Sequence, residues 1–330
     1  MPHLPRCLAT ATMELLILHA ATAATSAENR TPPIGVVPGA RQQQTCALAT
    51  ERMTAGANAL RNHFWNESTG LWEQNLWWHQ ANSLEVLASH AILDPDNETL
   101  RTQVEEDIQH MFQQNNNMSR GGPFLTGYFD DEEWWALGWL RAWELTGNHG
   151  YVERTNIIHQ HQVDMAWNDS SCGGGLMWQG TIYSENNRTG NPYKGAITNE
   201  LFLVISAKMA LLGPEDTRAE YLEWTERIWE WFWDTGMINA HWLVNDGLDE
   251  FAGHNAICAN NNQTEWTYNQ GLAPSSLPLL ILPSLRRFPW VPCFYLRAHA
   301  WSRRTARGSG LLLGTGAGKC RVAGNRLAHH

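Results

Sequence analysis

Four acidic residues follow one another from Asp130 to Glu133, directly before a segment rich in tryptophan. A structural interpretation is available, because the helix dipole favours acids in a first turn and Asp130-x-x-Glu133 resembles a capping box. It explains Glu132 and Glu133 well, but explains less well why Asp130 and Asp131 stand between a Gly-rich aromatic loop and an apolar helix. Two adjacent carboxyl groups shift each other's pKa, so that one stays ionised while the other can hold a proton. Glycoside hydrolysis needs such a pair, a nucleophile and a general acid, and both interpretations stay open on this segment alone.

Tryptophan is the second unusual feature, with 18 in 330 residues. We expect most of them to pack in a core, as the amphipathic pattern around Trp229 and Trp233 indicates. Others stand where loops meet predicted helices: Trp72, Trp77, Trp78, Trp178 and Trp266. Indole rings can stack on the C–H faces of sugars, while amide and carboxylate groups take the hydroxyls. The segments "WWHQAN" and "WTYNQG" offer both kinds of group, which favours a carbohydrate site.

The elements that must position these residues are helices, because apolar residues recur with helical spacing from about Thr45 onward. Segments apolar on one side, at 100–111 and 221–231, alternate with segments apolar nearly all round, at 134–143 and 201–212. A helix that is apolar on every side must be covered on every side. The pattern therefore predicts an all-α fold of helical hairpins, with inner helices enclosed by outer ones.

The charge distribution and the N-terminal segment limit the possible partners and location of the protein. Residues 1–265 carry 33 acidic and 14 basic side chains, a net charge of −19, whereas residues 266–330 carry +9. The acidic body argues against nucleic acid as a partner. Residues 1–27 resemble a signal peptide, with Arg6 before an apolar stretch that ends in small residues near Ala27. We therefore expect a protein that is secreted or held at the cell surface or cell wall, with membrane association left open.

Glycosylation sequons support this localisation, because several Asn-x-Ser/Thr triplets are spread along the chain. The expected N-glycosylation sites are Asn66, Asn97, Asn117, Asn168, Asn187 and Asn262.

The cysteines indicate a disulfide and no metal site. No Cys-x-x-Cys occurs, and the body contains Cys46, Cys172 and Cys258. One disulfide and one unpaired thiol are the default in an oxidising compartment. We predict a Cys172–Cys258 bond, because both cysteines precede motifs that we expect to face the site. Neither a metal ion nor a cofactor is expected, since the two histidines of His159-Gln160-His161 point apart on a helix.

Several segments, in order, resemble glycoside hydrolase family 76, the endo-α-1,6-mannanases that include fungal cell-wall members. They are "WWHQANSLEVLA", "GYFDDEEWWALGWLRAWELTGN", "CGGGLMWQ", "YKGAITNELFL", "NDGLD" and "WTYNQG". The resemblance covers residues 45–272 and implies an (α/α)6 barrel. It further implies retaining endo-hydrolysis of α-1,6-mannosidic linkages, with Asp130 as the nucleophile and Asp131 as the acid/base. The residues expected to bind substrate are Trp77, Trp78, Asn82, Tyr128, Trp134, Trp178, Asn199, Glu200, Asp246, Tyr268 and Asn269.

The end of the chain departs from that pattern. No acid follows Glu265, and prolines interrupt any long helix at Pro274, Pro278, Pro283, Pro289 and Pro292. We interpret residues 273–330 as an aberrant, basic and disordered tail, which leaves the predicted barrel incomplete. Two alternatives to hydrolysis by this monomeric protein therefore stay open. One is a transglycosidase that acts on cell-wall protein glycans, as some fungal relatives are thought to be. The other is a mannan-binding protein without catalysis.

Overall fold

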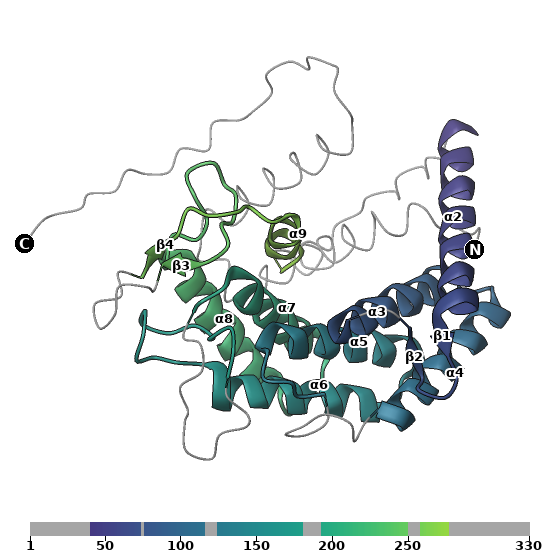
Figure 1. Cartoon of the computed structure of the whole chain (residues 1–330), viewed down its shortest axis with the longest axis horizontal. Coiled ribbons are helices and arrows are strands. Elements are labelled where there is room, and N and C mark those ends of the chain that lie inside the picture. Colours follow the sequence, from purple (N-terminus) through teal and green to yellow (C-terminus); the bar gives the residue numbers. More distant parts are fainter. Residues whose placement is uncertain (1–39, 74–75, 116–123, 181–192, 250–257, 277–330) are drawn as a thin grey trace, which may run out of the picture. The chain divides into compact units, whose positions relative to one another are not determined.

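The computed structural model describes residues 40–73, 76–115, 124–180, 193–249 and 258–276 (Figure 1). The predicted signal peptide, the sequons at Asn117 and Asn187 and the segment 277–330 lie outside these residues. The chain divides after Lys194 into two compact units, each of which is described by itself.

The first unit is a set of helices that pack one after another along the chain. In order, its elements are α2 (Ala40–Phe64), β1 (Trp65–Asn66), β2 (Leu71–Trp72), α3 (Trp77–Leu93), α4 (Glu98–Asn115), α5 (Phe129–Thr146), α6 (His149–His161) and the π-helix η2 (Gln162–Ala166). The two short strands pair antiparallel, with Trp65 opposite Trp72. Helix α5 packs against both α3 and α6, and α4 packs against α3 and α5.

Helix α5 is enclosed by its neighbours. Residues on all its sides are buried, among them Trp135, Leu137 and Trp139. It lies close to α3 at Gly138, where a Cβ atom would stand 3.1 Å from the carbonyl oxygen of Ala81. A larger residue at this position would push the two helices apart. By contrast, α4 buries one face, made by Leu100, Val104, Ile108 and Met111.

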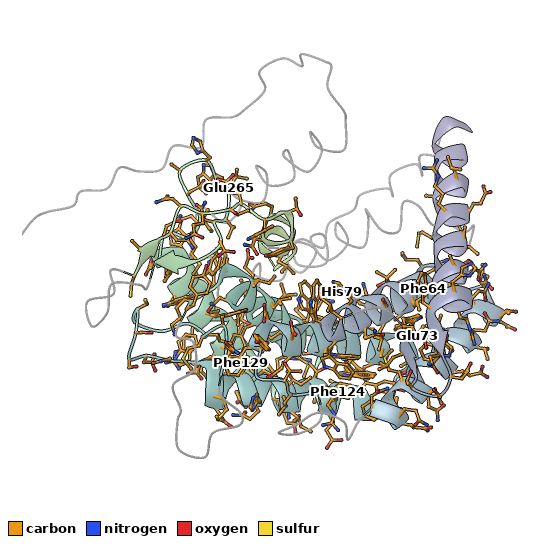
Figure 2. The ribbon with its side chains drawn as sticks, viewed as in Figure 1. Phe64, Glu73, His79, Phe124, Phe129 and Glu265 are labelled. Carbon is orange, nitrogen blue, oxygen red and sulfur yellow. The ribbon has the colours of Figure 1, made fainter. Side chains whose placement is uncertain are left out.

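An aromatic core fills the space beside α5. Phe124 is fully buried, and its ring lies 4.7 Å from that of Trp135 and 5.0 Å from that of Trp139 (Figure 2). Trp139 in turn stacks on Tyr151 of α6. Because aromatic pairs of this kind add to the free energy of burial, the core holds α5 firmly in place.

The second unit repeats the same design. Its elements are α7 (Ala196–Leu212), α8 (Arg218–Asp234), β3 (Leu248–Asp249), β4 (Ala259–Asn260) and α9 (Thr267–Ser276). Helix α7 is buried on nearly all sides and packs against α8 and α9, whereas α8 buries one face around Tyr221, Ile228 and Phe232. Helix α9 extends beyond the predicted domain end at 272.

The predicted all-α class is confirmed, and within each unit one-sided and enclosed helices alternate as expected. No helix in the described ranges is long and apolar enough to cross a membrane.

Candidate active site

The start of α5 is fixed by a segment distant in the sequence. Tyr128 is extended and precedes the helix without a side-chain cap. It forms a β-bridge with Gln179, flanked by hydrogen bonds from Phe129 N to Trp178 O (3.1 Å) and from Gly180 N to Gly127 O (2.9 Å). The first turn of α5 is therefore positioned by residues 178–180.

Asp130 lies half-buried in that first turn and has two hydrogen-bond donors. The indole Nε1 of Trp178 donates to its Oδ2 (3.1 Å), and the backbone N–H of Asp131 donates to its Oδ1 (3.1 Å). Burial raises the pKa of Asp130, whereas these hydrogen bonds act in the opposite direction because they favour the charged form. The arrangement suits a carboxylate that carries the negative charge of the pair.

Asp131 has a different environment. Burial, followed by the charge of Asp130, raises the pKa of Asp131 to about 7. Within the described part of the chain, no side chain or backbone group donates a hydrogen bond to its carboxyl group. Of the two aspartates, Asp131 therefore holds a proton more readily near neutral pH, and Asp130 ionises more readily.

The two glutamates that follow are fully buried, and they differ from each other. The Oε1 of Glu132 accepts hydrogen bonds from the backbone N–H groups of Thr126 (2.8 Å) and Gly127 (2.7 Å). Burial raises the pKa of Glu132 to about 8, against the effect of these hydrogen bonds. Neither oxygen of Glu133 has a hydrogen-bond partner in the described part of the chain, and burial raises the pKa of Glu133 well above its ordinary value.

The capping-box interpretation of this stretch is therefore wrong. The residue before α5 is Tyr128, not Asp130, and the carboxyl group of Glu133 caps nothing. The helix starts earlier than the pattern predicts because the bridge at Tyr128, which is a long-range contact, sets its first residue.

Aromatic side chains stand beside the aspartates. Trp134 follows Asp130 by four residues and so shares its side of α5. Its ring stacks with that of Trp78, with centroids 6.2 Å apart and an interplanar angle of 26°. Tyr128 is 41% exposed, and its ring lies 5.5 Å from that of Trp178. These four rings, which we call the aromatic group, are half-buried or exposed and flank the carboxyl pair.

Trp77 and Asn82 complete the predicted residues of the first unit. The ring of Trp77 stacks on Phe124 (5.9 Å) and lies 4.8 Å from Trp135, so it packs in the aromatic core and not with the aromatic group. Asn82 is half-buried on α3, one turn after Trp78.

The second unit carries the other predicted residues. Asn199 is buried and donates from Nδ2 to the carbonyl oxygen of Gly195 (2.8 Å), which is a structural contact at the start of α7. Asp246 accepts a hydrogen bond from the Nε1 of Trp266 (2.7 Å), and the ring of Trp266 stacks on that of Tyr268, which is 42% exposed. Asp246, which is half-buried, and the exposed Trp266 and Tyr268 form a second group of polar and aromatic side chains.

No hydrogen-bond partner is found among the described residues for the buried Thr198 Oγ1, both oxygens of Glu200 and both amide atoms of Asn269. Burial raises the pKa of Glu200 well above its ordinary value. Glu200 and Asn269 were expected from the sequence, but Thr198 was not, because a threonine in an apolar helix looks like an ordinary core residue.

Lys194 is a further residue that sequence reasoning missed. It is fully buried, and its Nζ donates to the carbonyl oxygens of Gly175 (2.7 Å) and Asn168 (3.2 Å). It thereby ties the "CGGGLMWQ" loop, which carries Trp178, to the segment that enters α7. Its place in the motif "YKGAITNELFL" was the available signal.

The cysteines and sequons can be placed in part. Cys172 and Cys258 are both disulfide-bonded, and their pairing with one another stays a prediction. Asn262 is exposed. The half-buried sequon asparagines accept hydrogen bonds through their side-chain oxygens: Asn66, Asn97 and Asn168. Among the residues that the structure describes, no group of three or more His, Cys, Asp or Glu could hold a metal ion.

Comparison with protein families gives one match. Residues 48–280 match the profile of glycosyl hydrolase family 76. The match includes all of α9 and ends beyond the predicted boundary at 272.

Two curated relatives illustrate the similarity in sequence. Mannan endo-1,6-alpha-mannosidase DCW1 of Eremothecium gossypii is 26% identical over 244 residues, which cover 70% of this chain and 50% of that protein. A putative mannan endo-1,6-alpha-mannosidase of Schizosaccharomyces pombe is 30% identical over 149 residues, 43% of this chain and 31% of that protein. The chain spans about half the length of the curated relatives it matches.

Solved structures show a similar fold. A family 76 mannosidase of Bacteroides thetaiotaomicron superposes with a TM-score of 0.64 at 16% identity, over 78% of this chain and 72% of that one. The GH76A α-1,6-mannanase of Salegentibacter sp. gives a TM-score of 0.61 at 21% identity, over 81% and 72%. An inactive variant of that mannanase, with two consecutive aspartates replaced by alanine, has been crystallised with α-1,6-mannotetrose.

Proposed function

The chain belongs to glycosyl hydrolase family 76, and we propose that it hydrolyses internal α-1,6-mannosidic linkages of mannan with retention of configuration. The observation that carries this proposal is the asymmetry of the two aspartates at the start of α5. Asp130 receives two hydrogen bonds, whereas Asp131 receives none from the described residues.

In the proposed reaction, Asp130 is the nucleophile and Asp131 the acid/base. The ionised carboxylate of Asp130 attacks the anomeric carbon while Asp131 gives its proton to the departing glycosidic oxygen, which leaves a covalent glycosyl-enzyme. Asp131, now ionised, takes a proton from a water molecule whose oxygen attacks the anomeric carbon. The bond from this carbon to Asp130 breaks, which releases the sugar and restores both groups. The pKa of about 7 for Asp131 suits an acid that must also act as a base.

The aromatic group supports a chain of sugars as the substrate. Stacked Trp78 and Trp134 offer a half-buried apolar surface on the side of α5 that carries Asp130, and the exposed ring of Tyr128 lies beside that of Trp178. Pyranose rings have apolar C–H faces that can lie on such surfaces. Several rings in a row suit an internal position in a polysaccharide better than a single terminal sugar.

The names of the relatives support the α-1,6-mannosidic linkage as the bond that is hydrolysed. Curated relatives of this chain carry the name mannan endo-1,6-alpha-mannosidase. In the Salegentibacter mannanase, the variant that lacks two consecutive aspartates is described as inactive, and it binds an α-1,6-linked mannose chain. By analogy, we assign mannan as the substrate of this chain. The glycosylation sequons along the sequence support a secreted or cell-wall location as its place of action.

The test compares Asp130→Asn and Asp131→Asn with Asp216→Asn, an exposed aspartate between α7 and α8. Each of the first two changes should lower hydrolysis of linear α-1,6-mannan by about a thousandfold or more without unfolding the protein, because each removes a group of the reaction itself. Asp216→Asn should retain wild-type rates. Near-normal rates in either of the first two variants would refute the assignment.

Product analysis separates the alternatives. NMR of the first sugars released should show the α-anomer, as retention requires. Longer mannose chains formed in place of reducing sugars would indicate a transglycosidase. Binding of mannotriose without any turnover would indicate a mannan-binding protein.

A further inference from the structure

Glu132 connects the loop before α5 to the helix itself. Its side chain is fully buried, and its Oε1 accepts the backbone N–H groups of both Thr126 (2.8 Å) and Gly127 (2.7 Å). Two donors on one oxygen hold two consecutive peptide groups in fixed orientation. The loop can therefore shift relative to α5 only if these two bonds break.

The other oxygen of Glu132 reaches a third element. Its Oε2 accepts a hydrogen bond from the Nε2 of Gln162 (2.8 Å), the first residue of η2, and lies 3.5 Å from the Nε2 of His161. One carboxyl group thus joins the loop, α5 and the end of α6.

The held loop leads directly to the proposed nucleophile. The carbonyl oxygen of Gly127 accepts the N–H of Gly180, and Tyr128 forms the bridge with Gln179. The next residue on that strand, Trp178, donates to Asp130. The chain of contacts therefore runs from Glu132 through the loop and the bridge to the carboxylate of Asp130.

A comparison with Glu133 shows that burial at this turn does not by itself account for the hydrogen bonds of Glu132. Both glutamates are fully buried, yet with the described residues the side chain of Glu133 makes no hydrogen bond, whereas that of Glu132 makes three. Burying a carboxyl group is costly, and the cost is offset where the group satisfies buried donors that would otherwise have none.

We propose that Glu132 is a positioning residue for the reaction: its carboxyl group holds the Thr126–Gly127 loop, and through the bridge to residues 178–180 it places Asp130 for attack. This inference rests on the proposed function. A displacement of about 1 Å at a reacting group can lower the rate by about a hundredfold, so a residue that never touches substrate can control the rate.

The experiment uses Glu132→Ala, Glu132→Gln and, as the matched control, Glu133→Gln. Glu132→Ala should lower kcat by about 10- to 100-fold with KM within about threefold, because the aspartates remain but are no longer held. Glu132→Gln keeps a side-chain oxygen for the two N–H groups and should restore kcat to within about fivefold of wild type. Glu133→Gln should keep the wild-type kcat, because Glu133 holds no other residue.

Hydrogen exchange provides a readout that does not depend on activity. Deuterium uptake of a peptide that covers residues 124–129, measured by mass spectrometry on the full-length chain, should rise in Glu132→Ala and stay at the wild-type level in the two glutamine variants. If Glu132→Ala does not fold, Glu132→Gln still decides. Wild-type protection of residues 124–129 from exchange, together with a kcat lowered more than a hundredfold, would mean that the carboxyl group of Glu132 acts in the chemistry. That result would overturn the inference.

Different results would overturn the positioning role of Glu132 and the proposed hydrolysis. A wild-type kcat in folded Glu132→Ala, or unchanged deuterium uptake at residues 124–129, would overturn the positioning role. If the wild-type protein shows no turnover of mannan, the proposed hydrolysis fails. The deuterium uptake then still decides whether Glu132 holds the loop.

Discussion

The indole Nε1 of Trp178 donates a 3.1 Å hydrogen bond to the Oδ2 of Asp130, although the two residues are 48 positions apart in the chain. The donor is held by its own backbone, since Trp178 O accepts the N–H of Phe129 and Trp178 N donates to Tyr193 O. A donor fixed in this way favours the ionised form of Asp130 and sets the direction of its carboxylate.

Trp178→Phe should therefore raise the pKa of Asp130, because the substitution keeps an aromatic ring but removes the donor to the charged form. The acidic limb of the pH profile of kcat/KM should move to higher pH, and the maximal rate should fall by about tenfold. Trp143→Phe, a half-buried tryptophan near the other end of α5, serves as the control. An unchanged acidic limb in Trp178→Phe would show that this hydrogen bond does not tune the nucleophile.

A second prediction concerns the proton on Asp131. Burial and the charge of Asp130 raise the pKa of Asp131 to about 7. The rate should therefore fall as the pH rises above about 7, because the acid loses its proton. In Asp130→Asn the neighbouring charge is gone, so the pKa of Asp131 should decrease. NMR of protein labelled with ¹³C at aspartate carboxyl carbons would detect this shift, and an increase would contradict the pairing.

Gly180 gives a third prediction, which concerns packing. A Cβ atom at this position would lie 2.6 Å from the Cζ of Phe129, whose ring is buried at the start of α5 (Figure 2). Gly180→Ala should destabilise the protein by about 1–3 kcal/mol, because the ring or the bridge must move. It should also lower activity, since Phe129 directly precedes Asp130. Gly271→Ala in α9 should be nearly neutral in thermal unfolding and in activity. Apart from the adjacent residues and the backbone of the helix itself, no atom of the described residues lies within 4 Å of the new Cβ.

Much of the fold could be predicted from the sequence, because helical periodicity is a local property. The one-sided pattern at 100–111 and the all-round pattern at 134–143 correspond to α4 and α5, with the expected faces buried. The adjacency of Asp130 and Asp131 and the surplus of tryptophan directed the search for a site to the first turn of α5, and the roles of these residues stay a prediction.

The rest depends on contacts that no local pattern specifies. Trp77 and Trp78 are neighbours in the sequence, but on a helix they point about 100° apart. One packs in the aromatic core, and the other pairs with Trp134. The different hydrogen bonding of the Glu132 and Glu133 side chains also depends on a long-range contact. Which of them meets backbone N–H groups depends on the loop at Thr126, whose path is set by the bridge to residues 178–180.

The last prediction is that this protein is more stable at mildly acidic than at mildly alkaline pH. Burial raises the pKa of several carboxyl groups in the folded state: to about 6 for Asp107 and to about 8 for Glu132, with Glu133 and Glu200 also well above their ordinary values. In the unfolded chain such groups titrate near pH 4. Between about pH 4 and pH 8 these carboxyl groups therefore bind more protons in the folded state than in the unfolded state. Burial lowers the pKa of His90, His159 and His161, which act in the opposite direction below about pH 6.5. The carboxyl groups with a raised pKa outnumber these histidines, so the free energy of unfolding decreases as the pH rises.

Glu133→Gln and Glu200→Gln test this cause directly. Each replaces a buried carboxyl group, for which the described residues supply no hydrogen-bond partner, with a neutral group of the same shape. Each variant should lose less stability than the wild type between pH 5 and pH 8, when thermal unfolding is followed by circular dichroism at both pH values. Glu223→Gln, at an exposed position of α8, should show the wild-type pH dependence. A melting temperature that rises from pH 5 to pH 8 in the wild-type protein would mean that its buried acids do not retain their protons on folding.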